Sequence, residues 1–159
     1  ILKETISGNI KLDIYGPIYN EPYWKECKLI IDDFPERISV NYKGSLPANK
    51  VIDMLQQYHS LFLPTSGENF GHAILECFMA GRPVIISDQT PWKNLSDHGA
   101  GYDLSLKDKK VFIKAIMQMA EMEQPEFNEL MRSTHQYIAG YINNPSGLQE
   151  NINLFMSEE

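Results

Sequence analysis

The sequence has little of what several common classes of protein depend on. It contains two cysteines in 159 residues, Cys27 and Cys77, and neither lies near another Cys or a His at a spacing that suits zinc. We therefore expect two reduced thiols and a cytoplasmic protein without a structural disulfide. The four histidines are scattered along the chain, so no metal site is expected.

Long hydrophobic runs and a surplus of positive charge are absent too. No apolar run approaches the roughly 20 residues that a helix needs to span a bilayer. The formal net charge of −7 argues against nucleic acid as a partner, because binding to phosphates depends on Lys and Arg. With 43% hydrophobic and 22% charged residues, the composition is that of a soluble globular protein with a single domain.

What is present is a regular alternation of strand and helix patterns. Strands are predicted over 10–15, 38–42, 61–63, 84–86 and 102–104, and helices over 1–6, 21–34, 47–59, 71–80, 92–97, 108–123, 125–141 and 146–156. The helix over 21–34 would pack through Trp24, Cys27, Ile30, Ile31 and Phe34. This order predicts an α/β fold, a doubly wound parallel sheet with helices on both faces. Ligands of such sheets lie outside the carboxyl ends of the strands, and four polar strand exits would share that rim.

The most informative segment is residues 65–76, TSGENFGHAILE. It follows a short apolar run that Pro64 ends, which predicts a buried strand. From Gly71 the apolar positions Ala73, Ile74, Cys77 and Phe78 recur at helical spacing, which would place one face of a helix against the sheet. The segment is therefore predicted to be a strand-to-helix turn at the edge where ligands bind.

The residue types of this turn suit an anionic, polyhydroxylated ligand. The start of a helix offers unpaired N–H groups and a positive dipole to phosphate, and Gly67 and Gly71 allow close approach of the backbone. Glu68 and Glu76 can each accept two hydrogen bonds from the neighbouring hydroxyls of a ribose or a hexose. Taken singly, Glu68 could equally be a charge that favours the helix start, and Glu76 an ordinary solvated residue.

Together these residues resemble the signature of the family 4 glycosyltransferases, in which two glutamates are separated by seven residues. Gly67 to Gly71, followed by Glu76, carry the resemblance, and residues 80–85, AGRPVI, are similar to the continuation Ala-Gly-x-Pro-Val-Ile in that family. The family has the GT-B architecture. The resemblance implies that 1–159 is a Rossmann-like, nucleotide-sugar donor-binding domain of the group 1 type. Its segment 146–159 would be a C-terminal helix that crosses to a missing N-terminal domain, or that packs on its own sheet.

The resemblance also implies a role for each residue of the site. Glu68 is the expected catalytic residue and contacts the donor sugar, while Glu76 holds the ribose hydroxyls. The remaining donor-binding positions are expected at Ser66, Gly67, Asn69, Phe70 and Gly71 around the diphosphate and sugar, at Gly16 as a floor residue, and at Tyr42, Lys43 and Gly44 beside the base.

The function implied is transfer of a sugar from a nucleotide diphosphate sugar to an acceptor, with the anomeric configuration retained. The expected setting is polysaccharide or glycoconjugate biosynthesis, with no metal and no cofactor. The full-length enzyme would associate peripherally with the inner face of the membrane. Two alternatives stay open, a GT-B sugar-nucleotide epimerase and a non-catalytic doubly wound regulatory or interaction domain. A phosphorylase is disfavoured, because no lysine near the motif suits a pyridoxal cofactor.

The start of the sequence generates a first prediction. The chain opens at Ile1 as though inside a helix, which suggests an excised domain, and its first arginine is Arg37. Similar enzymes supply an Arg and a Lys for the diphosphate just upstream of the matching position. We therefore expect the isolated chain to bind a nucleotide or nucleotide sugar weakly and to transfer nothing. Incubation with nucleotide sugars and a simple acceptor should give no product, and detectable turnover would refute this expectation.

Overall fold

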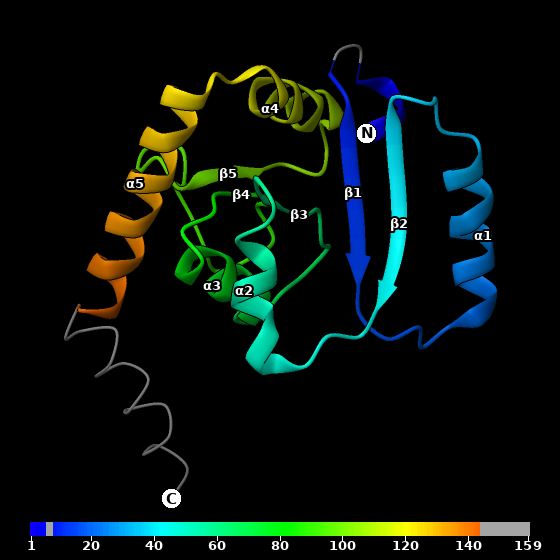
Figure 1. Ribbon diagram of the computed structural model, residues 1–159, viewed down its shortest axis with the longest axis horizontal. Helices are drawn as coiled ribbons and strands as arrows, with labels where there is room; N and C mark the ends of the chain where they lie inside the picture. Colours follow the sequence, from blue (N-terminus) through cyan, green and yellow to red (C-terminus); the bar gives the residue numbers. More distant parts are fainter. Residues whose placement is uncertain (6–7, 144–159) are drawn as a thin grey trace, which may run out of the picture.

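The computed structural model describes residues 1–5 and 8–143 (Figure 1). The C-terminal segment 146–159, with the helix predicted over 146–156, lies outside the described residues. At the other end, the helix predicted over 1–6 is reduced to a 3-10 turn, η1, over Leu2–Glu4. That prediction is therefore wrong over the part that the structure describes.

The other elements follow the predicted alternation closely, with one exception. They are β1 (Ile10–Tyr15), α1 (Glu21–Asp32), β2 (Ile38–Gly44), a 3-10 turn η2 (Ala48–Lys50), α2 (Val51–Leu55), β3 (Leu61–Leu63), α3 (His72–Met79), β4 (Val84–Ser87), β5 (Gly101–Leu104), α4 (Lys109–Glu121) and α5 (Gln124–Ile142). Side-chain caps start two of the helices. Asn20 accepts a hydrogen bond from the N–H of Tyr23 at 3.0 Å, and Asp108 accepts one from the N–H of Lys110 at 2.9 Å.

The exception is the short helix predicted over 92–97, which does not form. The carboxylate of Asp103, on β5, accepts hydrogen bonds from the N–H groups of Asn94 at 3.1 Å and Leu95 at 2.9 Å. Asn94 has a φ of 57°, which lies outside the right-handed helical region. The segment is therefore a turn that a side chain from a neighbouring strand holds in place.

All strand pairs are parallel, as predicted, but the described strands form two sheets instead of one. One sheet has the order β1-β2 and the other β3-β4-β5. In Figure 1, β1 and β2 run across the direction of the other three strands. Between β1 and β3 lies a hollow of about 440 Å³. Because β3 has three residues, pairing with β1 would add few hydrogen bonds, which favours the split.

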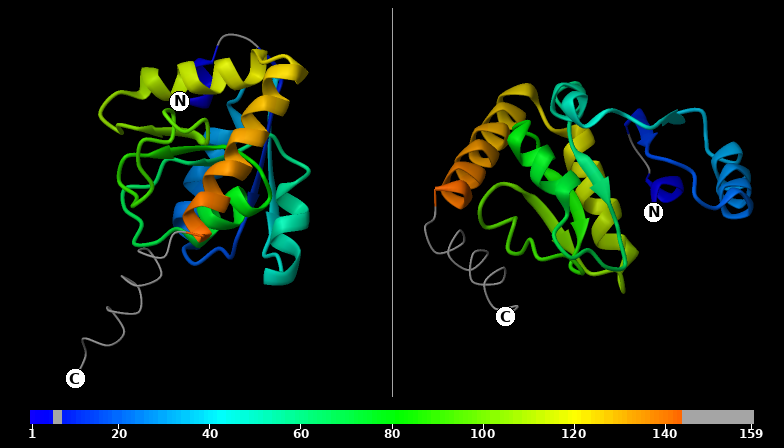
Figure 2. Two further views of the ribbon diagram at one scale, coloured as in Figure 1. Left: turned by 90° about the vertical axis from the view of Figure 1, so that its left-hand side faces the viewer. Right: turned by 90° about the horizontal axis from the view of Figure 1, so that it is seen from below.

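The three-stranded sheet carries helices on both faces, and β4 is its centre. Val84 and Ile86 pack into a core formed with α2, α3 and α5, whereas Ile85 faces a second core formed with α4. The alternation follows from the two-residue period of a strand. Figure 2 shows these helices around the sheet from two further sides. The predicted cover on both faces is confirmed for this sheet.

The two-stranded sheet is covered more thinly. Helix α1 has no buried residue. It contacts the sheet through Trp24, whose ring centroid lies 5.0 Å from that of Tyr42. Ile30, expected on the inner face of this helix, is 61% exposed. That expectation is wrong because α1 lies against a narrow sheet, which covers a smaller stripe of the helix than a wide sheet would.

The close contact between β5 and β4 generates a prediction about stability. Gly101 has a φ of 126°, and a Cβ at this position would lie 2.0 Å from the carbonyl oxygen of Val84. Gly101→Ala should therefore lower the free energy of unfolding by about 3 kcal/mol, through backbone strain and overpacking. Urea denaturation measures the change.

A matched control is Gly140→Ala, in α5. A Cβ at Gly140 would meet nothing within 4 Å, and alanine favours a helix by roughly 0.5–1 kcal/mol relative to glycine. The control should unfold at the same urea concentration as the wild type or a higher one. A Gly101→Ala midpoint equal to that of the wild type would contradict the packing described for β4 and β5.

Candidate functional site

The motif lies where the sequence places it, in the turn between β3 and α3. The hydroxyl of Thr65 donates to the carbonyl of Gly67 at 2.8 Å and accepts a hydrogen bond from the N–H of Gly67 at 3.3 Å. Two further bonds tie the turn to the exit of β4. The hydroxyl of Ser87 donates to the carbonyl of Thr65, and the N–H of Glu68 donates to the carbonyl of Gln89 at 3.1 Å. The exits of neighbouring strands are thus joined.

Gly71 begins α3 in a conformation that favours glycine. Its φ is 79°, and a Cβ there would lie 2.8 Å from Cδ1 of Ile74. Its carbonyl accepts the N–H groups of Ile74 at 2.9 Å and Leu75 at 3.0 Å. No side chain caps this helix start. A helix start without a side-chain cap leaves N–H groups of its first turn without an intrahelical partner, and such groups can bind an anion.

Trp92 fixes the position of Phe70. The indole N–H of Trp92 donates to the carbonyl of Phe70 at 2.7 Å, and the two ring centroids are 6.1 Å apart. Trp92 itself is 3% exposed and contacts Phe78 of α3 at 5.1 Å between centroids. The backbone of the motif is thereby held against the core.

The two glutamates differ in environment. Glu68 is exposed in the turn, and Glu76 is half-buried on α3. Ile74, Cys77 and Phe78 form the buried face of the helix, and Glu76 lies about 200° around the axis from Ile74. Glu76 therefore points away from the core, as predicted. Ala73 is exposed, so its predicted place on the inner face is wrong.

The second group of predicted residues gathers at the exits of β1 and β2. The N–H of Gly16 donates to the carbonyl of Gly44 at 3.0 Å, and the hydroxyl of Tyr42 donates to the carbonyl of Gly16 at 2.7 Å. Lys43 lies between Tyr42 and Gly44, with its side chain 42% exposed. We name Gly16, Tyr42, Lys43 and Gly44 the β1–β2 cluster.

Residues 66–71 and Glu76 form the motif cluster. The predicted site residues are therefore brought together in two clusters, each on its own sheet. The expectation that all four strand exits share one sheet edge is wrong, because the described strands do not form one continuous sheet.

A buried carboxylate that the sequence analysis missed lies beside the β1–β2 cluster. The side chain of Asp13, on β1, is 1% exposed and accepts hydrogen bonds from the hydroxyl of Tyr58 at 2.6 Å and from Nδ2 of Asn41 at 2.9 Å. The ammonium groups of Lys11 and Lys43 lie 3.2 and 4.0 Å from its Oδ2. In the sequence Asp13 alternates with apolar residues, as a solvent-facing position would, so no signal marks its burial.

These partners keep Asp13 charged. Burial alone would raise the pKa of Asp13, but the hydrogen bonds from Tyr58 and Asn41 outweigh it and hold the pKa below its usual range. The pKa of Tyr58 is raised, first by burial and then by its bond to this carboxylate. The pair is therefore a phenol hydroxyl that donates to an ionised carboxylate, which is a strong type of hydrogen bond.

The described residues contain neither a metal-binding group nor a membrane-spanning helix. Over 1–5 and 8–143, no group of three or more His, Cys, Asp and Glu side chains could hold a metal ion. Within the same ranges, no helix is long and apolar enough to cross a membrane.

Comparisons with known proteins agree with this architecture. A family model described as "Glycosyl transferases group 1" matches residues 1–138. Among solved structures, the chain is similar to a point mutant of TarM from S. aureus in complex with fondaparinux, alpha-GlcNAc-glycerol and UDP, with 25% sequence identity and a TM-score of 0.69. The match covers 92% of this chain and 29% of that one, so the chain spans less than a third of TarM. The predicted fold class is confirmed. No curated protein matches the chain.

The orientation of α3 can be tested through the two cysteines. Burial raises the pKa of the Cys77 thiol to about 12, and the thiolate is the reactive form. Cys27 is partly exposed. A disulfide reagent at about pH 8, near the ordinary pKa of a thiol, should label Cys27 quickly in the folded protein and Cys77 only after unfolding. Cys27→Ser should abolish the fast reaction. Two equally fast thiols would contradict the placement of α3.

Proposed function

The chain belongs to the group 1 glycosyl transferases, and from that premise we propose that it is the donor-binding domain of a retaining glycosyltransferase. The observation that carries the proposal is the uncapped start of α3 at the exit of β3, with Glu68 before it and Glu76 on its outer side. This arrangement offers one site for a diphosphate and two carboxylates for hydroxyl groups. Membership of the family also disfavours the interpretation as a non-catalytic domain.

The start of α3 would receive the diphosphate. The backbone N–H groups of Asn69, Phe70 and Gly71 would meet its oxygens or those of the sugar, and the helix dipole would favour their negative charge. Ser66 and Gly67 complete the turn above them. Gly71 supplies the left-handed backbone conformation from which the helix starts.

The two glutamates would divide the sugars of the donor between them. Glu68 positions the transferred sugar, and Glu76 accepts hydrogen bonds from the ribose hydroxyls. In the transfer step, the bond between the anomeric carbon and the diphosphate oxygen breaks, and a bond to the acceptor oxygen forms on the same face of the sugar. The acceptor proton passes to the departing diphosphate. The rate enhancement would come from positioning and from stabilising the charge that develops on that diphosphate.

The β1–β2 cluster would receive the nucleoside. Tyr42, Lys43 and Gly44 offer an aromatic ring, a cation and an accessible backbone beside the base, and Gly16 forms the floor. The hydrogen bond from Tyr42 to the carbonyl of Gly16 keeps the two strand exits together. UDP is the first nucleotide to test, since the TarM complex contains it.

The wider setting is proposed by analogy with the family. We propose that acceptor-binding residues come from another domain. We expect the reaction to need neither a metal nor a cofactor, with the start of α3 and the upstream Arg and Lys of similar enzymes supplying positive charge and the glutamates supplying the positioning. The product would be a polysaccharide or glycoconjugate made in the cytoplasm, with the full-length enzyme at the inner face of the membrane.

Titration with UDP, GDP, ADP and their sugars tests the donor site. We expect the wild type to bind at least one of them, and Glu76→Ala to weaken that binding about tenfold, because hydrogen bonds to a charged group contribute roughly 1.5–3 kcal/mol. Calorimetry or the fluorescence of Trp24 and Trp92 can follow the titration.

The matched control is Glu36→Ala, which removes an exposed glutamate in the turn before β2. It should bind like the wild type. If the wild type binds none of these ligands at millimolar concentration, the proposed donor site is wrong. If Glu36→Ala weakens binding as much as Glu76→Ala, the effect is one of overall charge and the role given to Glu76 is wrong.

A further inference from the structure

Tyr58 connects the two sheets that carry the two halves of the proposed site. It lies between α2 and β3, and its N–H donates to the carbonyl of Leu55 at 3.0 Å. Its hydroxyl donates to Oδ2 of Asp13, on β1, at 2.6 Å. Because that hydroxyl has one proton, it must accept from the hydroxyl of Tyr15, which lies 3.0 Å away. A chain of two hydrogen bonds therefore runs from Tyr15 through Tyr58 to Asp13.

This link lies beside the β1–β2 cluster. Asp13 and Tyr15 occupy the last part of β1, and Gly16 follows them directly. Oδ2 of Asp13 is also 4.0 Å from the ammonium of Lys43. A movement of Tyr58 relative to Asp13 would therefore move residues that are proposed to contact the base.

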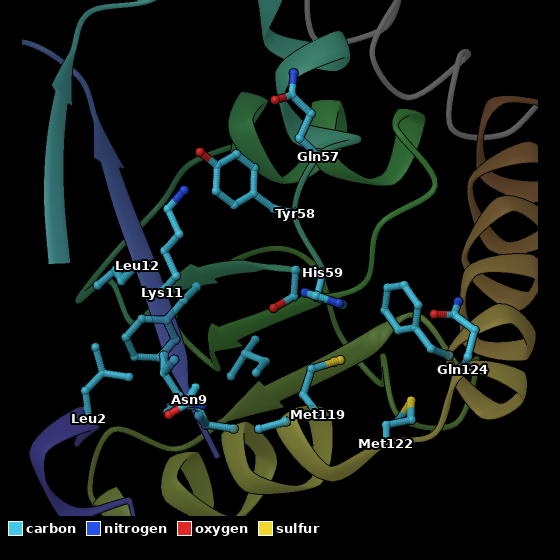
Figure 3. Close-up of a pocket in the computed structure, with 17 residues that line it drawn as sticks. Leu2, Asn9, Lys11, Leu12, Gln57, Tyr58, His59, Met119, Met122 and Gln124 are labelled. Carbon is cyan, nitrogen blue, oxygen red and sulfur yellow. The ribbon is translucent and has the colours of Figure 1, made fainter. Parts of the chain in front are cut away.

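The opposite end of β1 is held in a different way. Ile10 packs against the core formed with α4, and a Cβ at Gly8 would lie 3.1 Å from Cβ of Ala120. The hollow of about 440 Å³ separates β1 from β3 between these two ends. Figure 3 shows Tyr58 at one side of this hollow, with its hydroxyl directed toward the strand that carries Lys11 and Leu12. One end of β1 is thus fixed by apolar packing, and the other by hydrogen bonds.

We propose that Tyr58 and Asp13 are positioning residues that hold the β1–β2 cluster and the motif cluster at the separation that a nucleotide diphosphate requires. The inference rests on the proposed function, in which the base contacts one cluster and the diphosphate the other. A ligand that spans both clusters binds tightly only if the clusters are already placed, since otherwise part of the binding free energy is spent on ordering them. A ligand that contacts one cluster does not depend on the link.

Tyr58→Phe removes the link and leaves the ring. Asp13 keeps its hydrogen bond from Asn41 and its ion pair with Lys11, so the variant is expected to fold. Tyr102→Phe is a matched control, because Tyr102 lies on β5 and packs against the core formed with α4, away from the link. Both substitutions remove one phenol hydroxyl from a half-buried tyrosine.

The first test measures the separation without a ligand. Spin labels at Glu21→Cys, at the start of α1 beyond the exit of β1, and at Gln118→Cys, on α4, would report the distance between the end of β1 that Tyr58 holds and the three-stranded sheet with its helices, in a Cys27→Ser background. Cys77 is buried and should stay unlabelled. Pulsed electron spin resonance should give a broader distance distribution for Tyr58→Phe than for the parent, and an unchanged one for Tyr102→Phe. Equal widths for Tyr58→Phe and the parent would overturn the inference.

The second test compares a ligand long enough to contact both clusters with one that contacts a single cluster. UDP would span both clusters, whereas inorganic pyrophosphate would contact the start of α3. In Tyr58→Phe we expect the Kd for UDP to rise about tenfold, the factor that corresponds to a hydrogen bond to a charged group, and the Kd for pyrophosphate to change less than about twofold. Asp13→Asn, which retains an oxygen for Tyr58, should lie between Tyr58→Phe and the wild type.

The outcomes separate this inference from the proposed function. Equal losses for UDP and pyrophosphate in Tyr58→Phe would show a general disturbance of the fold and overturn the inference, as would unchanged affinity for UDP. In both cases the wild type still binds nucleotide, and the proposed function stands. A wild type that binds no nucleotide would overturn the proposed function, and the positioning role with it.

Discussion

The burial of β4 on both faces is the constraint on which the rest of the structure depends. Its side chains alternate between two cores, Val84 and Ile86 toward α3 and α5, and Ile85 toward α4. Complete burial of such a side chain contributes roughly 1.5–3 kcal/mol. A one-residue shift in the pairing register of β4 would turn each of these side chains to the opposite face and would therefore cost more free energy than a surface interaction contributes. Once β4 is fixed, the positions of two neighbouring elements follow. β3 pairs with β4, and the buried face of α3 packs on Val84 and Ile86. The motif, which directly follows β3 in the sequence, is then placed at the exit of that strand.

The parts of the site that depend on local sequence could be predicted for this reason. The apolar spacing of Ile74, Cys77 and Phe78 fixes which side of α3 is buried, and Glu76 must then face outward. Pro64 and Gly71 mark the end of a strand and the start of a helix. These features need only a helical period and two residues that end or begin an element, all within residues 64–78, so a single sequence contains them.

The parts that depend on distant residues could not be predicted. Asp103 caps the turn over 92–97 from the next strand, which removes a helix that local propensity favours. The split into two sheets depends on whether β1 pairs with β3, and the sequence of neither strand determines that pairing. The bond between Asp13 and Tyr58 joins residues 45 positions apart. Polar contacts at such separations carry no periodic signal, so sequence analysis overlooked them.

The two clusters are also fixed with different strength, and this difference has a functional meaning. Trp92 and Gly71 hold the start of α3 against an apolar core, where a displacement would open a cavity or break a buried hydrogen bond. The β1–β2 cluster lies on a thinly covered sheet, tied to the rest by hydrogen bonds at Tyr58. Groups that stabilise charge in a reaction must be rigid, because reorganisation would cost part of the stabilisation. In the proposed function, the part of the fold held by the core would bind the diphosphate, and the part held through Tyr58 would bind the nucleoside.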